Sequence, residues 1–240
     1  MLNGLDLFSG IGGLTLALVP WVQPIAYCEN DAYAQSVLLS RQATGDLPIA
    51  PIWDDIRTLT NVSGVDIIYG GFPCQDISVA GHGVGLEGQR SGLVFEAFRL
   101  ISECGPTFVF MENVPAIRTR GGERVGKELA SRGYDCRWWT YPAAEVGAQF
   151  EGQRWFLAAA HREALWQQPR RWNGKSGEAP TLDSPNGEPW FTAWTSKGGF
   201  KPRVSGAGNG VPFAVDRDRA LGNAVVPLQA REAFKRLMGL

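Results

Sequence analysis

The stretch that decides the fold is residues 2–13, LNGLDLFSGIGG, at the start of the sequence. Residues 2–8 are mostly apolar and predict a short buried strand, and the three glycines that follow predict a tight turn. Residues 14–19 then begin a helix. Glycines let a backbone approach a ligand closely at a helix N-terminus, so this order is typical of domains that bind a nucleotide-like cofactor. A plain turn between strand and helix would also fit, because the spacing is not Gly-x-Gly-x-x-Gly.

The alternation of strand and helix continues through most of the chain. A terminal helix is expected after Gly222-Asn223, packed back on the first strand and turn. Alternation of this kind predicts an α/β fold, with a mostly parallel sheet of about seven strands and helices on both faces. The further strands are predicted at 25–29, 65–69, 107–111, 136–141 and 154–160, and the further helices at 33–41, 93–103 and 124–132.

Length and composition indicate one folded α/β domain with a small appended lobe. The chain has 240 residues, of which 44% are hydrophobic and 20% charged, as in ordinary globular proteins. No apolar run approaches the roughly 18 residues of a membrane span, and there is no signal-peptide pattern, so we expect a cytoplasmic protein with no membrane partner. The four cysteines stand far apart and form no Cys/His cluster, which predicts neither disulfides nor a bound metal.

The composition changes in residues 161–203. This region has five prolines, five glycines and four tryptophans, and its seven basic and four acidic residues give it a net charge of +3 within a chain of net charge −1. No sustained helical or strand period runs through it. We therefore divide the chain into a regular α/β domain, 1–160 plus 204–240, and an irregular lobe, 161–203, where positive charge could meet nucleic acid.

Two segments that follow predicted strands carry reactive side chains. Cys74 lies in GGFPCQDIS, residues 70–78, and Glu112 lies in MENVP, residues 111–115. A lone cysteine is more often a small buried hydrophobe, but the proline and glycines here indicate a rigid loop at the ligand-binding edge of the sheet. A carboxyl group in a closed pocket has a raised pKa and can protonate a ring nitrogen, although a solvated glutamate is the simpler alternative.

Two further carboxylates suit a nucleoside-like ligand. Glu29 ends the second predicted strand, about twenty residues after the glycine turn, where a carboxylate can accept both hydroxyls of a ribose. Asp55, near the end of a third candidate strand, could accept an adenine amino group. A nicotinamide-binding enzyme would share these features, but it would leave Cys74 and Glu112 without a role.

Taken together, these motifs resemble the cytosine-C5 DNA methyltransferase family. The order and spacing match over nearly the whole chain outside 161–203, and the sequence is more similar to the short enzymes of phages and prophages than to longer restriction-modification enzymes. The matching motifs are DLFSGIGG at 6–13, Glu29, Asp55-Ile56, GFPCQ at 71–75, ENV at 112–114 and GNAV at 222–225.

The resemblance implies a Rossmann-like S-adenosylmethionine-dependent methyltransferase that acts on C5 of a flipped cytosine in duplex DNA. Cys74 would attack C6, Glu112 would bond to or protonate N3, and Arg154 would donate to the cytosine carbonyl. The residues expected at S-adenosylmethionine are Phe8, Ser9, Gly10, Ile11, Gly12, Gly13, Glu29, Asn30, Asp55, Ile56, Pro73, Leu93, Asn223 and Ala224. Those expected at DNA are Gln75, Ser78, Arg90, Arg170, Arg171 and Lys175.

The sequence departs from the family in two places. Members usually carry Gln-x-Arg-x-Arg before a late strand, whereas residues 150–154, FEGQR, keep only Arg154 and have Gly152 in place of the other arginine. The region available for target recognition is also short. The glycine-rich residues 81–92 resemble the family's mobile catalytic loop, which would act as a lid over the flipped base.

Two alternatives share the fold. A cytosine-C5 methyltransferase that acts on RNA would use the same mechanism, although Gln75 favours DNA. A non-catalytic DNA-binding relic would explain the lost arginine, but Cys74, Glu112 and the complete glycine turn argue against it. We expect a monomer that acts on duplex DNA.

Overall fold

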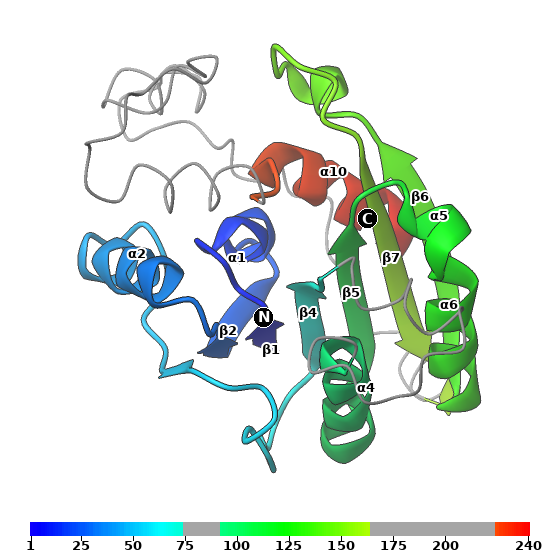
Figure 1. Cartoon of the computed structure of the whole chain (residues 1–240), viewed down its shortest axis with the longest axis horizontal. Coiled ribbons are helices and arrows are strands. Elements are labelled where there is room, and N and C mark those ends of the chain that lie inside the picture. Colours follow the sequence, from blue (N-terminus) through cyan, green and yellow to red (C-terminus); the bar gives the residue numbers. More distant parts are fainter. Residues whose placement is uncertain (74–91, 164–223) are drawn as a thin grey trace.

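A computed structural model describes residues 1–73, 92–163 and 224–240. In this part of the chain one seven-stranded sheet has the strand order β3-β2-β1-β4-β5-β7-β6. All neighbours from β3 to β5 pair in parallel, and β7 runs antiparallel to both β5 and β6 (Figure 1). The strands are β1 (Leu2–Leu7), β2 (Val22–Cys28), β3 (Ile52–Trp53), β4 (Ile67–Gly71), β5 (Phe108–Asn113), β6 (Tyr134–Tyr141) and β7 (Arg154–His161).

Helices cover both faces of the sheet, as predicted. One face packs on α4 and α6 around an apolar cluster that includes Leu5, Ile68 and Val109. The other face packs on α1 and α10 around a cluster that includes Ile67 and Phe110. The helices are α1 (Gly13–Leu18), α2 (Ala32–Ala43), α4 (Leu93–Cys104), α5 (Ile117–Arg120), α6 (Gly122–Ser131) and α10 (Pro227–Met238), with a 3-10 turn η2 (Ala143–Val146).

The predicted fold class is therefore confirmed, and the boundaries differ in instructive places. The strand predicted at 65–69 is shifted to 67–71, because Gly70 and Gly71 belong to β4 and not to the loop. A Cβ atom on Gly70 would lie 2.1 Å from the carbonyl oxygen of Leu7, so β1 and β4 approach more closely than a side chain permits. β7 extends to His161, one residue into the region that composition marked as irregular. Residues 164–203 of that region lie outside the described residues.

The C-terminal helix α10 packs mainly on α1, β6 and β7, whereas the sequence predicted packing on the first strand and turn. Arg231 is 4% exposed, and its guanidinium donates to the carbonyl oxygens of Ala17 (3.0 Å) and Leu16 (3.2 Å). Val225, just before α10, lies so close to Gly13 that a Cβ there would be 3.1 Å from the Val225 carbonyl oxygen. Segments more than 200 residues apart thus meet at the glycine turn.

No helix in residues 1–73, 92–163 or 224–240 is long and apolar enough to cross a membrane. In the same ranges no group of three or more His, Cys, Asp or Glu side chains could hold a metal ion.

Candidate active site

The glycine turn between β1 and α1 forms one end of the site. Phe8, Gly10 and Gly12 all have positive φ, at 55°, 54° and 84°. A Cβ atom on Gly12 would lie 2.4 Å from Cδ1 of Leu47, so both the backbone angle and the packing require glycine here. Gly12 therefore packs on Leu47 and does not line the cavity. The sequence had placed it among the residues that contact the cofactor.

Glu29 lies against this turn, directly after β2. One carboxylate oxygen accepts the backbone N–H of Gly10 (2.7 Å) and the other accepts that of Asp31 (2.8 Å). A carboxylate can accept about four hydrogen bonds, so both oxygens keep capacity for the hydroxyls of a bound ribose. The two amide contacts fix the carboxylate beside the turn before any ligand arrives.

A buried polar network lies beneath the turn, and sequence reasoning missed it. The Thr15 hydroxyl donates to Oδ2 of Asp6 (2.6 Å) and lies 2.7 Å from the Tyr69 hydroxyl, which connects β1, α1 and β4. Asp6 is 1% exposed, and this burial raises the pKa of its carboxyl to about 8. The signal was an acidic residue between the apolar Leu5 and Leu7, in the buried second half of β1.

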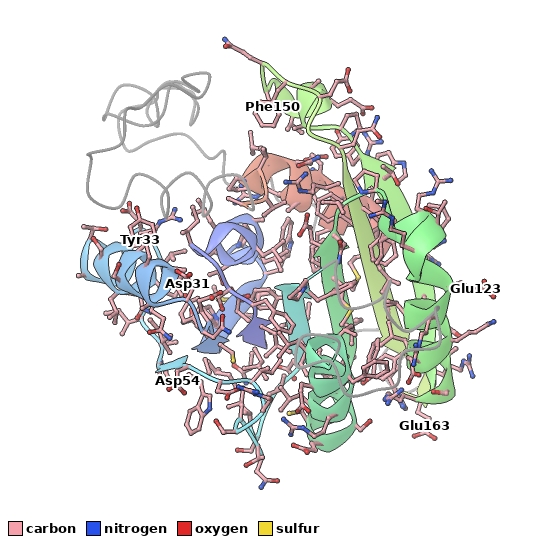
Figure 2. The ribbon with its side chains drawn as sticks, in the orientation of Figure 1. Asp31, Tyr33, Asp54, Glu123, Phe150 and Glu163 are labelled. Carbon is pink, nitrogen blue, oxygen red and sulfur yellow. The ribbon has the colours of Figure 1, made fainter. Side chains whose placement is uncertain are left out.

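A cavity of about 520 Å³ extends from the turn across the carboxyl edge of the sheet. This volume is in the range of small-molecule sites. Figure 2 shows two of its acidic residues, Asp31 at the start of α2 and Asp54 after β3, neither of which the sequence had singled out. The predicted cofactor residues that line it are Phe8, Ser9, Gly10, Ile11, Gly13, Glu29, Asn30, Asp55, Ile56, Pro73, Leu93 and Ala224.

Asp55 is in the cavity wall, but it is not on a strand. β3 ends at Trp53, and Asp55 occupies the turn beyond it. Its carboxylate forms a two-pronged ion pair with Arg57, with an Nη2–Oδ2 distance of 2.8 Å. Hydrogen bonds from Arg57 lower the pKa of Asp55, which keeps this carboxylate ionised as an acceptor.

At the other end of the cavity, Glu112 and Arg154 form an ion pair. Nε of Arg154 lies 2.9 Å from Oε1 of Glu112, and the two side chains are 19% and 11% exposed. Glu112 is on β5, and Arg154 begins the antiparallel strand β7, which brings the two together at the strand ends. Burial raises the pKa of Glu112 to about 7, and Arg154 opposes that rise. The raised pKa that the sequence predicted for a carboxyl group in a closed pocket is therefore found at Glu112.

Asn113 connects β5 to the segment that leads to the cysteine. Its side-chain amide donates to the Phe72 carbonyl oxygen (2.8 Å), and its Oδ1 accepts the backbone N–H of Val114. Phe72 and Pro73 immediately precede Cys74 in the chain. The sequence showed the Glu-Asn-Val motif but indicated no role for Asn113. Buried side-chain amides are usually hydrogen-bonded, and this one joins the end of β5 to the segment before Cys74.

Gly152, at the position of the missing arginine, has a backbone conformation and a close neighbour that both favour glycine. Its φ is +45°, and a Cβ atom there would lie 2.4 Å from the Phe150 ring. Phe150 is 55% exposed at the tip of the connection between β6 and β7 (Figure 2). An arginine here would require the exposed Phe150 ring to move and would leave a residue with a side chain in the left-handed backbone region, so glycine fits this position best.

Several predicted site residues lie outside the described part of the chain. They are Cys74, Gln75, Ser78, Arg90, Arg170, Arg171, Lys175 and Asn223.

The sequence was compared with known proteins. The model of the family described as "C-5 cytosine-specific DNA methylase" matches residues 2–192. The match covers well over half of the chain, so this protein belongs to the C-5 cytosine-specific DNA methylase family. The family resemblance inferred from the motifs is thereby confirmed.

Individual relatives agree with this assignment. The chain is 32% identical over 163 residues to the type II methyltransferase M.CviJI of Paramecium bursaria Chlorella virus IL3A, covering 66% of this chain and 43% of that protein. It is 33% identical over 174 residues to M2.BsuMI of Bacillus subtilis, covering 69% and 42%. The match thus spans less than half the length of these relatives.

A solved structure has the same fold. It is described as a candidate DNA modification methyltransferase encoded within an E. coli prophage, and it superposes with a TM-score of 0.55 and 27% identity. The superposition covers 68% of this chain and 47% of that one.

Proposed function

We propose that this protein is a DNA (cytosine-5-)-methyltransferase that uses S-adenosylmethionine. The observation that carries the proposal is the pairing of Glu112 and Arg154 at one end of a cavity whose other end is the glycine turn with Glu29. One end suits a nucleoside-like cofactor, and the other suits a polar heterocycle that needs a proton donor and a cation. Family membership supports the same reaction.

The residues of the cavity fit S-adenosylmethionine. Gly10 and Gly13 of the turn line the cavity without a side chain, Glu29 can accept the ribose hydroxyls, and Asp55 can accept the adenine amino group. Phe8 and Ile56 supply apolar walls for the adenine ring. When bound, the cofactor supplies a methyl group on a positively charged sulfur.

On the catalytic side, C5 of cytosine becomes nucleophilic only after a group adds to C6. The Cys74 thiolate forms the bond to C6, and the electron pair of the C5–C6 double bond moves into the ring. Glu112, protonated near neutral pH, donates its proton or a hydrogen bond to N3, and Arg154 donates to the ring carbonyl.

C5 would then accept the methyl group that bound S-adenosylmethionine would supply, while Glu112 and Arg154 hold the cytosine ring. The C5 proton leaves to solvent, its electron pair re-forms the C5–C6 double bond as the C6–sulfur bond breaks, and the Cys74 thiolate is restored. A proton transferred to N3 returns to Glu112.

The substrate we propose is duplex DNA with the target cytosine flipped out of the stack, because a buried pair such as Glu112 and Arg154 cannot reach a stacked base. In this proposal residues 81–92 close over the flipped base. The lobe of 161–203 supplies cationic contacts through Arg170, Arg171 and Lys175, while Gln75, Ser78 and Arg90 contact DNA near the base. The protein acts as a monomer.

The test is to incubate the purified protein with duplex DNA of mixed sequence and S-adenosylmethionine, digest to nucleosides and measure 5-methylcytosine by mass spectrometry. Native protein should form it, and Cys74→Ser should form none, because serine is a far weaker nucleophile for this addition. Transfer RNA is tested in parallel. Product on RNA alone would replace the proposed substrate, and no product on either, with cofactor binding intact, would favour the non-catalytic alternative.

A further inference from the structure

Gln229, on the first turn of α10, contacts a distant part of the chain. It is fully buried, and its side-chain amide nitrogen donates to two backbone carbonyls, of Tyr141 (2.6 Å) and Gly152 (2.8 Å). Tyr141 is the last residue of β6, and Gly152 lies two residues before β7. A single amide thus closes the base of the β6–β7 connection, residues 142–153.

The connection held in this way leads directly into the catalytic pair. The backbone N–H of Ala143 donates to the Glu151 carbonyl oxygen (2.8 Å), so the two sides of the connection are already joined next to Gly152. Two residues further on, Arg154 reaches Oε1 of Glu112 at 2.9 Å. The position of Gly152 therefore sets where the arginine side chain starts.

Gln229 is not explained by helix packing alone. Its Oε1 is buried and has no hydrogen-bond partner among the described residues, which is a cost to stability that an apolar residue would avoid. Its neighbours Ala230 and Ala233 are fully buried apolar residues. What the glutamine adds to α10 is the pair of donors that reach the connection.

We propose that Gln229 is a positioning residue that fixes the β6–β7 connection so that Arg154 meets Glu112. With Gly152 in place of the family's other arginine, Arg154 is the retained cation of this element, and its placement depends on the backbone around it. The activity part of this inference rests on the proposed function, whereas the structural part does not.

The inference predicts a specific change in pH dependence. Within the described residues, Arg154 is the charged group that lowers the pKa of Glu112, and the facing residues Gly71 of β4 and Phe156 of β7 carry no charge. Cys74 also belongs at this edge but lies outside those residues. If Arg154 is displaced, the pKa of Glu112 rises, so the protonated donor persists to higher pH.

The test compares Gln229→Leu with a matched variant, Gln42→Leu. Gln42 on α2 is also a buried glutamine: its Oε1 accepts the backbone N–H of Ala50 (3.1 Å) and its Nε2 has no partner among the described residues. It lies away from Glu112 and Arg154 and does not line the cavity. The Gln229 variant should still fold, because Arg231 and Phe234 hold α10 in place.

Hydrogen exchange is measured on both purified full-length variants, together with kcat, KM and the pH profile for 5-methylcytosine formation. In Gln229→Leu we expect faster exchange in residues 142–153, kcat reduced about 10- to 100-fold with KM for S-adenosylmethionine within about 2-fold, and an alkaline limb raised by about one pH unit. Gln42→Leu should show only a lower melting temperature.

Unchanged exchange in 142–153, or an alkaline limb that stays at the wild-type pH, would overturn the inference and leave Gln229 a purely structural residue. If the wild-type protein forms no 5-methylcytosine, the proposed function fails. The exchange comparison then still decides whether Gln229 holds the connection.

Discussion

The two ends of the cavity are built in different ways. At the proposed cofactor end, the hydrogen bonds of the Glu29 and Asp6 carboxylates join residues 19 or fewer positions apart, and Val225 is the distant residue that packs against the glycine turn. At the catalytic end, Glu112 and Arg154 are 42 positions apart, and the backbone that carries Arg154 is held by Gln229, a further 75 positions on. Local sequence thus specifies the first end, whereas strand order and a returning helix assemble the second.

The largest expected effect is at the catalytic end. Glu112→Gln keeps the shape of the side chain but removes the acidic proton, so kcat should fall by about 10²- to 10⁴-fold. S-adenosylmethionine affinity, measured by calorimetry, should stay within a few-fold, because the glycine turn and Glu29 are untouched. Equal losses of kcat and of S-adenosylmethionine affinity would mean that a change at Glu112 also alters the binding of the cofactor at the other end of the cavity.

A smaller effect, on stability, is expected at the cofactor end. Gly12→Ala places a Cβ at φ +84° and 2.4 Å from Leu47, which should cost about 1–3 kcal/mol in the free energy of unfolding. Thermal or urea unfolding measures the change. Gly126→Ala in α6 is the control: it has open space and no positive φ, and it should stabilise by about 0.5–1 kcal/mol. A neutral Gly12→Ala would show that the turn can relax.

A further effect concerns the pH dependence of stability. The pKa of Asp6 is raised to about 8 in the folded protein, from an ordinary value of 3.8. The folded state therefore binds this proton more tightly than the unfolded state does. Its contribution to stability is full below about pH 3.8 and is lost as the pH rises toward 8.

Asp6→Asn removes this titration and keeps a hydrogen-bond acceptor for Thr15. Glu112, with its pKa raised to about 7, contributes a slope of the same sign in both proteins. The melting temperature of Asp6→Asn should therefore fall less than that of the wild type between pH 5 and pH 8. Parallel curves would mean that Asp6 is already ionised in the fold, balanced by its hydrogen bonds.

Much of the fold and of the cofactor end could be predicted because their signals are local. Apolar runs and the glycine turn marked the strands and the first helix, and Glu29 stood where a second strand ends. The missed features depended on distant neighbours. Gly70 and Gly71 were assigned to a loop, since nothing in the sequence indicates that β4 lies too close to Leu7 for a side chain. Asp55 was placed near a strand end that stops two residues earlier.

By itself, the sequence determined the α/β class and the family, and it indicated Glu112 and Arg154 as candidate catalytic residues, because these inferences depend on residue types at fixed spacings. Only the tertiary structure decided that these two side chains form an ion pair and that the Glu112 side chain is buried enough to raise its pKa. It also decided that Asp6 bonds to Thr15 beneath the glycine turn and that Gln229 bonds to the β6–β7 connection. The physical reason is that desolvation and hydrogen bonding depend on atoms brought together by the packing of β5, β7 and α10, whose order in space differs from their order in the chain.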